Sequence, residues 1–81
     1  MISINVPSTA NNLKTLMDSN NITVRQLQQE LGFNNPNSIY KWLRGEQLPS
    51  IDNLFVISNV LNCTIEDIII VDRWGGELNG K

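Results

Sequence analysis

The chain has 81 residues, 41% of them apolar, and a net charge of −2, which fits one small globular domain and excludes a disordered chain. The absence of His and the presence of a single Cys, Cys63, exclude an intramolecular disulfide and a Ser-His or Cys-His catalytic pair, and argue against a zinc site. No apolar run approaches the ~20 residues that span a bilayer, and no secretory signal is recognisable, so we expect a cytoplasmic protein without a cofactor.

Charge is unevenly distributed along the chain. Residues 11–45 contain four basic and two acidic side chains and carry +2, whereas residues 46–81 contain two basic and six acidic ones and carry −4. The acidic total argues against a nucleic-acid partner, but a mildly basic front and an acidic rear also suit a protein with one DNA-facing surface. Chance scatter of surface charge explains the same numbers, so charge alone leaves the partner open.

The N-terminus combines a strand pattern with a helix pattern. Apolar residues alternate with polar ones over residues 1–6, which predicts a short strand that ends at Pro7. Ser8 or Thr9 would then cap a first helix, whose apolar residues recur three and four apart. We expect this helix to end at residues 20–21, because Asn tolerates the left-handed conformation that closes a helix.

Two short amphipathic helices are predicted next. Thr23 begins the second helix with the spacing of a capping box, and Gly32 ends it. The third helix begins at Asn35, a good N-cap, or at Pro36, which suits the first helical position, and it ends at Gly45. At 100° per residue this helix has two sides. The apolar side, expected in the core, comprises Ile39, Trp42 and Leu43. The polar side comprises Asn37, Lys41 and Arg44, flanked by Ser38 and Tyr40.

The fourth predicted helix begins after Ser50 and is apolar on two sides. The main side, expected to be buried, comprises Ile51, Leu54, Ser58 and Leu61, widened by Phe55 and Ile57. Val56 and Val60 lie nearly opposite. Either the chain's own ends or a second subunit covers them, and the sequence leaves both open. Leu48, in the preceding linker, is also expected in the core.

A short fifth helix and a strand complete the predicted elements. Thr64 caps the helix, and residues 68–71 are β-branched, which favours an extended strand. This strand can pair with residues 2–6 in the same chain or in a partner. We expect the chain to fray after Trp74, and Cys63 to be an inert, buried side chain.

A second helix, a short turn and a third helix with one buried and one basic side form the layout of a helix-turn-helix. The run ITVRQLQQELGFNNPNSIYKWLRGEQLPSIDNLFVISNVLNCTIEDI resembles the Cro/CI-type, lambda-repressor-like (XRE) family, and the aligned pattern extends from Leu13 to about Ile69. The matching positions are Leu31-Gly32, Ile39, Trp42, Arg44-Gly45, Pro49-Ser50, Leu61 and Cys63-Thr64. Two departures are a turn one residue longer than the common pattern, and Val24 where the family often has Gln.

The resemblance implies an all-α fold of five helices, to which the residue patterns add short strands at the termini. Together they predict an N-terminal strand or arm over residues 1–8, the helix-turn-helix domain over residues 9–71, and a tail over residues 72–81. The resemblance alone further implies a homodimer that binds double-stranded DNA at an inverted-repeat operator and controls transcription, most simply as a repressor, with the third helix in the major groove. No membrane or small-molecule partner is expected, and localisation would be cytoplasmic, at the nucleoid.

Seven side chains are candidates for contacts with DNA: Arg25, Asn35, Asn37, Ser38, Tyr40, Lys41 and Arg44. In the major groove, Asn37 can pair with an adenine edge and Lys41 can donate to guanine or to a phosphate. Near the start of the third helix, free N–H groups favour a phosphate. Arg25 and Arg44, with Lys14 as a weaker candidate, suit phosphates. The alternative for each is a solvated surface residue without a partner.

Two other classes of function compete with this reading. A small protein-interaction module, such as an antitoxin or adaptor on the same scaffold, would explain the acidic balance and the second apolar side of the fourth helix. An enzyme is disfavoured, because the sequence contains no nucleophile–base pair, no metal-ligand cluster and no glycine-rich phosphate loop.

Overall fold

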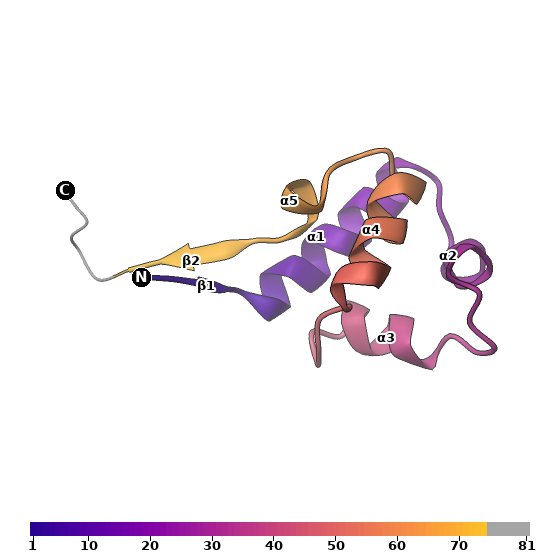
Figure 1. Ribbon diagram of the computed structural model, residues 1–81, viewed down its shortest axis with the longest axis horizontal. Coiled ribbons are helices and arrows are strands. Elements are labelled where there is room, and N and C mark those ends of the chain that lie inside the picture. Colours follow the sequence, from indigo (N-terminus) through magenta and orange to yellow (C-terminus); the bar gives the residue numbers. More distant parts are fainter. Residues whose placement is uncertain (75–81) are drawn as a thin grey trace.

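The computed structural model describes residues 1–74 and shows a body of helices from which two strands project (Figure 1). In chain order the elements are β1 (Ile2–Ile4), α1 (Val6–Ser19), α2 (Val24–Leu31), α3 (Asn37–Leu43), α4 (Ile51–Val60), α5 (Ile65–Ile68) and β2 (Val71–Arg73). The predicted all-α fold of five helices with short terminal strands is confirmed. The proposed boundaries of arm, domain and tail stay a prediction.

The first helix begins earlier than the sequence suggested. Its N-cap is Asn5, whose side-chain oxygen accepts the Ser8 N–H at 2.9 Å, and Pro7 lies in the first turn rather than between strand and helix. Ser8 and Thr9 are therefore not caps. The Thr9 hydroxyl instead accepts the Ile70 N–H at 2.9 Å, so this buried side chain joins α1 to the segment before β2.

The core lies between the helices and draws on all five of them. Its fully buried members, with relative exposure below 2%, are Leu13, Leu27, Ile39, Ile57, Leu61 and Ile68. Helix α1 packs against α3 and α5, and α4 packs against α2 and α5. Burial of these side chains supplies the main stabilising free energy, because each removes apolar surface from water.

Local signals set most of the helix ends as predicted. Thr23 and Gln26 form a capping box at the start of α2, and Ser50 accepts the Asn53 N–H at the start of α4. Gly32 and Gly45 have φ values of 72° and 74°, the left-handed conformation that closes a helix without the strain of a side chain. A Cβ at Gly45 would also lie 3.2 Å from Pro7 Cα.

Helix α3 begins one residue later than expected. Pro36 is its N-cap and Asn37 its first residue, so Pro36 does not occupy the first helical position. The Asn35 side-chain oxygen accepts the Asn37 N–H at 3.0 Å and thereby shapes the turn before the helix. Asn35 and Pro36 therefore belong to the turn before α3 and not to the helix itself.

The fourth helix departs from its predicted burial. Leu54 and Ile57 are buried, but Ile51 and Phe55 are 67% and 63% exposed, so the prediction that they join the core is wrong. Val60 is half-buried and packs against the core from the other side. The residues near Val60 are Ile22, Gln26, Gln29 and Glu30, so this side faces α2 and not the chain's own ends, and cover by a second subunit stays a prediction. Leu48 is only half-buried.

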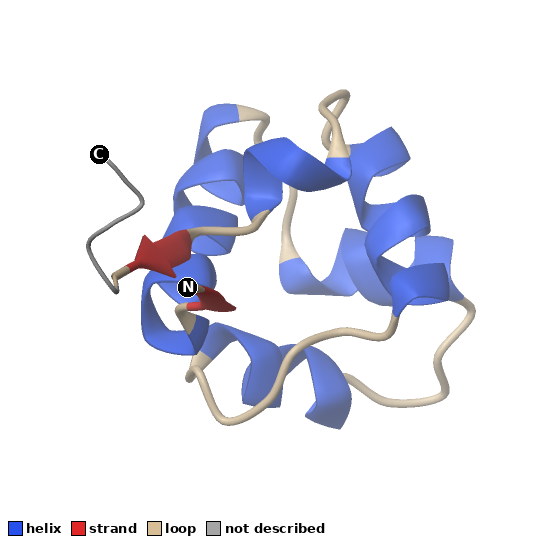
Figure 2. Cartoon of the chain, turned by 60° about the vertical axis from the view of Figure 1, so that its left-hand side comes forward, coloured by secondary structure: helices blue, strands red, loops and turns tan. Residues whose placement is uncertain are grey.

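The two strands form an antiparallel sheet within the chain, which answers one question that the sequence left open. Ile2 pairs with Arg73, Ser3 with Asp72 and Ile4 with Val71, and Figure 2 shows the strands next to one another. Ile68 is the last residue of α5 and is buried, so the strand begins at Val71 and continues to Arg73, and the prediction of a strand over residues 68–71 is wrong except at Val71. The expected fraying after Trp74 falls outside the described residues.

Candidate nucleic-acid interface

Helix α3 is held by its apolar side, as the sequence predicted. Ile39 is fully buried and Trp42 is 3% exposed. The ring of Phe33, from the turn, meets the Trp42 ring edge-to-face, with centroids 5.9 Å apart and an interplanar angle of 62°. The turn and the helix are thereby fixed to the same core, which leaves the opposite side of α3 with a defined direction.

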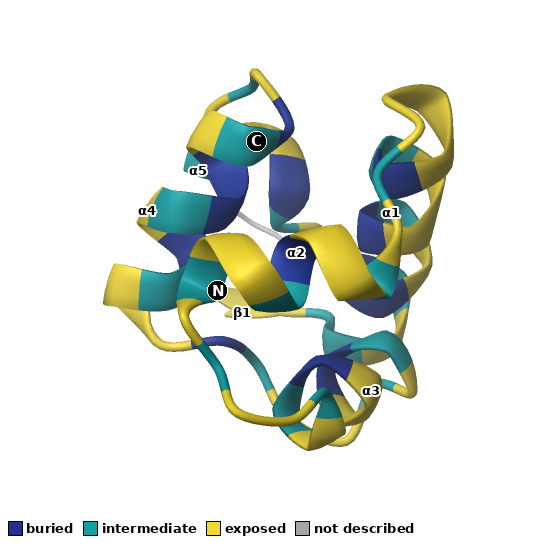
Figure 3. Cartoon of the chain, turned by 90° about the vertical axis from the view of Figure 1, so that its right-hand side faces the viewer, coloured by how far each residue is buried: buried dark blue, intermediate teal, exposed yellow. Residues whose placement is uncertain are grey.

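That opposite side is exposed. Asn37, Tyr40 and Lys41 are exposed, Tyr40 by 45% of its surface, and Ser38 is half-buried. Figure 3 shows the exposed positions on the outward side of α3, below α2 in that view. Four of the seven candidates thus lie on one short helix that is anchored from behind. The described residues show nothing sealing this side of the helix.

At the start of α3, one of the N–H groups expected to be free is already bonded within the chain. The Asn37 N–H is already bonded to the Asn35 side-chain oxygen, so this donor is not available to a phosphate. Asn35 is itself exposed, and its documented contact is with the protein's own turn. Its side chain orders the backbone that leads into α3.

Arg44 follows α3 and is paired within the chain. Its guanidinium Nε donates to the Glu46 carboxylate, and both side chains are about half exposed, at 56% and 50%. This hydrogen bond raises the pKa of Arg44 and lowers the pKa of Glu46. A contact between Arg44 and a phosphate therefore requires Arg44 either to leave Glu46 or to use its remaining N–H groups.

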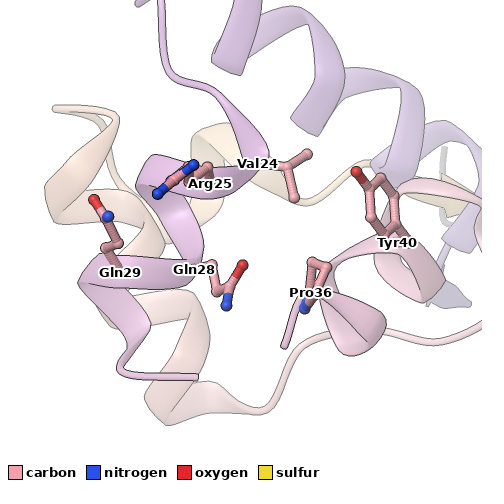
Figure 4. Close-up of a pocket in the computed structure, with 6 residues that line it drawn as sticks. All are labelled: Val24, Arg25, Gln28, Gln29, Pro36 and Tyr40. Atoms are coloured by element: carbon pink, nitrogen blue, oxygen red, sulfur yellow. The ribbon is translucent and has the colours of Figure 1, made fainter. Parts of the chain in front are cut away.

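Helices α2 and α3 enclose a shallow hollow of about 380 Å³ that brings Arg25 and Tyr40 onto one site. In Figure 4 Arg25 and Tyr40 lie at opposite sides of the hollow, with Val24 between them and Gln28 and Pro36 below in that view. Two of the seven candidates, from separate helices, therefore share one concave surface. Lys14, on α1, is exposed and does not line this hollow.

Gln28 and Gln29 line the same hollow and were missed by the sequence reasoning. Gln28 donates from its side-chain nitrogen to the Phe33 carbonyl at 3.2 Å, which ties α2 to the turn. Gln29 is exposed. The available signal was their spacing of three and four from Arg25, which places all three on one side of α2. Val24, at the other departure from the family pattern, is half-buried against the core.

This arrangement has the chemistry of a surface that reads a duplex. A single helix fits the major groove, where amide and ammonium groups can distinguish base edges. Backbone phosphates flanking the groove require cations, and Arg25 and Lys41 supply exposed ones from two helices. The hollow is open and polar in part, so it suits extended contact with a surface better than enclosure of a small molecule.

Comparison with protein-family models decides the class of protein. A model described as helix-turn-helix matches residues 13–68, from within α1 to the end of α5. The chain belongs to the Cro/CI-type helix-turn-helix family. This helix-turn-helix protein is thus a DNA-binding regulator in general terms, from a family that is typically non-enzymatic. A comparison with curated proteins found no match.

No helix within residues 1–74 is long and apolar enough to cross a membrane. The same part of the chain contains no cluster of three or more His, Cys, Asp or Glu residues that could hold a metal ion. Cys63 is half-buried rather than fully buried, and burial raises the pKa of its thiol, which favours the unreactive protonated form.

Proposed function

We propose that this helix-turn-helix protein is a sequence-specific repressor that binds double-stranded DNA as a homodimer and places α3 in the major groove of an inverted-repeat operator. The observation that carries the proposal is the polar side of α3, where Asn37 and Lys41 are exposed while Ile39 and Trp42 anchor the helix. In the docking geometry typical of this motif, the second helix of the pair enters the groove and the first crosses the backbone.

Each side chain has a specific proposed role. Asn37 pairs with an adenine edge, and Lys41 donates to guanine or to a neighbouring phosphate. Tyr40 packs on a thymine methyl group or donates its hydroxyl to a phosphate. Arg25 contacts a phosphate from α2, with Gln29 beside it at the same hollow. Asn35, Ser38 and Arg44 complete the proposed contacts at the two ends of α3.

The short length of α3 favours a dimer, and occupancy of the operator favours repression. A helix of seven residues reaches only a few base pairs, so a second copy on the other half-site doubles the sequence that is read. Repression requires only that the operator be occupied, whereas activation also requires a surface for the transcription machinery. The localisation that goes with this function is the cytoplasm, at the nucleoid.

The distribution of charge supports docking by one side only. Helix α5 carries Glu66 and Asp67 in its first turn and lies on the opposite side of the body from α3 (Figure 1). Negative charge there repels the phosphate backbone, so it disfavours wrong orientations while α2 and α3 approach the duplex. The proposed specificity thus combines attraction at α3 with repulsion at α5.

Binding-site selection from random duplexes tests the proposal. We expect the wild-type chain to enrich an inverted repeat, and Lys41→Glu to abolish that enrichment while the far-UV circular dichroism stays unchanged. Arg73→Glu is the matched control, because it changes the charge equally at an exposed position on β2 to which no DNA contact is assigned. Recovery of no sequence by the wild type, or equal loss in both variants, would contradict reading by α3.

A second candidate function rests on α4. Ile51 and Phe55 lie one turn apart and are more than 60% exposed, an apolar pair of the kind that contacts protein partners. A protein-interaction module on this scaffold would use that pair. Such a module would enrich no DNA sequence in the selection, and Ile51→Ser with Phe55→Ser would abolish its partner binding while Lys41→Glu would not.

A further inference from the structure

We propose that the outer edge of β1 is the surface through which two copies of this chain pair, antiparallel, into a four-stranded sheet. The order of strands would be β2, β1, β1 of the partner and β2 of the partner. This inference specifies the homodimer and so rests on the proposed function for its biological role. The proposed interface itself requires no DNA, so the experiments below are carried out without DNA.

Within residues 1–74 the side chains of the sheet are left without cover. All six residues of β1 and β2 are exposed, including the apolar side chains of Ile2, Ile4 and Val71. A two-stranded sheet is marginally stable in water unless it gains further strands or packs against another element. Because the strands project from the body (Figure 1), the helices of the same chain leave these side chains exposed.

The unpaired backbone groups lie on the outer edge of β1. Met1 and Trp74 exchange hydrogen bonds, and the Asn5 N–H donates to the Ile70 carbonyl at 2.8 Å. Hydrogen-bonded pairs alternate with non-bonded ones in an antiparallel ladder, so Ser3 faces β2. Ile2 and Ile4 therefore direct their N–H and C=O groups away from β2, and no described residue bonds to them.

A twofold axis at Ser3 makes this edge complementary to itself. Ile2 then lies opposite the partner's Ile4, and Ile4 opposite the partner's Ile2, so the outward N–H and C=O groups of both copies form four hydrogen bonds. The same register places Ile2 beside the partner's Ile4 on one face, an apolar pair that stabilises sheets. Val71 extends that face on each side, since it pairs with Ile4 within the chain.

The outer edge of β2 is unsuitable for the same arrangement. The equivalent twofold axis lies at Asp72 and would place two carboxylates directly opposite one another, which destabilises a strand pair. The Asp72 carboxylate is also bonded to the Asn5 side-chain nitrogen at 3.2 Å. Charges and their neighbours commonly protect an edge from pairing. Strand β1, Ile-Ser-Ile, carries no charged side chain. Its outer edge is therefore open to pairing with a second copy, whereas the charge of Asp72 disfavours such pairing at the outer edge of β2.

The occupant that fits this edge is a second copy, because antiparallel pairing about a twofold axis closes after two chains. Three residues from each chain bury far less than the ~1,600 Å² typical of stable complexes. The free protein should therefore associate weakly and reversibly, and operator binding would strengthen the pairing by holding both copies together.

Disulfide trapping tests the predicted register. In a Cys63→Ala background, Ser3→Cys places two thiols opposite one another at the axis, in a non-bonded pair whose ~4.5 Å Cα separation allows a disulfide. We expect rapid oxidation to a covalent dimer. Ile2→Cys is the matched control, since in this register residue 2 lies opposite the partner's Ile4 and not opposite its own counterpart, and it should oxidise much more slowly. Faster oxidation of Ile2→Cys, or equal rates, would overturn the twofold axis at Ser3 of β1.

Sedimentation equilibrium of the uncrosslinked chain gives the second test. Ile4→Pro removes an outward N–H from β1 without removing a bond to β2, and symmetry doubles the loss, so dimer affinity should fall by about tenfold or more. Val71→Pro makes the equivalent change on the outer edge of β2 and should alter affinity less than about twofold. A wild type that stays monomeric at millimolar concentration, or that loses dimer only with Val71→Pro, contradicts the proposal.

The outcomes separate this inference from the proposed function. Self-association through β1 without any enriched DNA sequence would retain the interface and reject the regulator. An enriched inverted repeat together with Ser3→Cys that does not cross-link would retain the regulator and reject this interface. Capture of a different protein that is lost with Ile4→Pro but not with Val71→Pro, by a chain that is itself monomeric, would assign the edge to another occupant and reject the second copy.

Discussion

Helices α2 and α3 are anchored in the core by a buried side, whereas the sheet of β1 and β2 is exposed at every residue. Each helix has a buried side, with Leu27 in α2 and Ile39 and Trp42 in α3, and directs polar side chains outward. Both strands are exposed along their whole length, apolar residues included. The helices can therefore hold the proposed DNA-contacting surface without a partner, whereas the described residues leave the sheet exposed.

The difference shows what burial contributes to each region. In the helices, apolar contacts fix the side of α3 that carries Asn37 and Lys41, which would lower the entropy lost in the proposed binding to DNA. In the sheet, the register is set by backbone bonds and by the Asn5–Asp72 contact, and no core fixes it. Substitutions should therefore have unequal effects in the two regions, and the following predictions test that inequality.

The largest effect is expected in the core beneath the reading surface. Leu27→Ala removes a fully buried side chain of α2 and should lower the free energy of unfolding by about 2–5 kcal/mol. Ile2→Ala, in the exposed sheet, should change it by less than about 0.5 kcal/mol. Urea titration followed by circular dichroism measures both. Equal losses would show that the sheet is part of the cooperative core.

A smaller effect is expected where glycines close α2 and α3. Gly32→Ala introduces strain at φ 72° and meets no atom within 4 Å, so it should cost about 1 kcal/mol. Gly45→Ala has the same strain at φ 74° and also places its Cβ 3.2 Å from Pro7 Cα. Its loss of stability should therefore exceed that of Gly32→Ala. The thermal midpoints of the two variants measure the difference, and a reversed order would contradict the packing of α3 against α1.

A helix cap provides the next comparison. Thr23→Ala removes the side chain that accepts the Gln26 N–H at 3.1 Å and should cost about 1 kcal/mol. Because α2 is short, the loss should appear locally as faster amide hydrogen exchange in Leu27 and Gln28. Thr15→Ala is a control on α1, where the hydroxyl bonds a carbonyl within an intact helix. Similar exchange in both variants would contradict a specific role of the capping box.

The smallest expected effect is on the pH dependence of stability, through Asp67 of α5, the helix that precedes β2 in the chain. The Thr64 backbone N–H donates to the Asp67 carboxylate at 2.9 Å and lowers the pKa of Asp67. A lowered folded-state pKa gives stability that is present above the ordinary value and is lost as the pH falls through the folded value. The stability difference between the wild type and Asp67→Asn should therefore shrink below about pH 4. A difference that stays constant from pH 7 to pH 2 contradicts this.

Local sequence signals predicted much of the fold. Thr23, Ser50 and Thr64 cap helices and Gly32 and Gly45 close them, because these effects act within a few residues. Errors arose where distant residues decide the outcome. Thr9 resembles a cap but bonds to Ile70, which lies 61 positions away, and residues 68–71 resemble one strand although Ile68 completes α5.

The candidate site was predictable in part for the same reason. The two sides of α3 follow from its period alone, and the burial of Ile39 and Trp42 confirmed the inner side. The meeting of Arg25 with Tyr40 depends on the angle between α2 and α3, which no local pattern specifies. The spacing of Gln28 and Gln29 from Arg25 places them on its side of α2, but that they share a hollow with Tyr40 depends on the same angle. The pairing of Arg44 with Glu46 depends on the chain's turn after Gly45.

Amide chemical-shift mapping with the selected duplex tests the central claim most directly, because it reports the contacted surface of the intact chain. The account predicts that the largest shifts fall at Asn37 to Arg44 and near Arg25, while α5 changes little. Largest shifts in α4 and α5, with residues 37–44 unperturbed at saturating duplex, would contradict it.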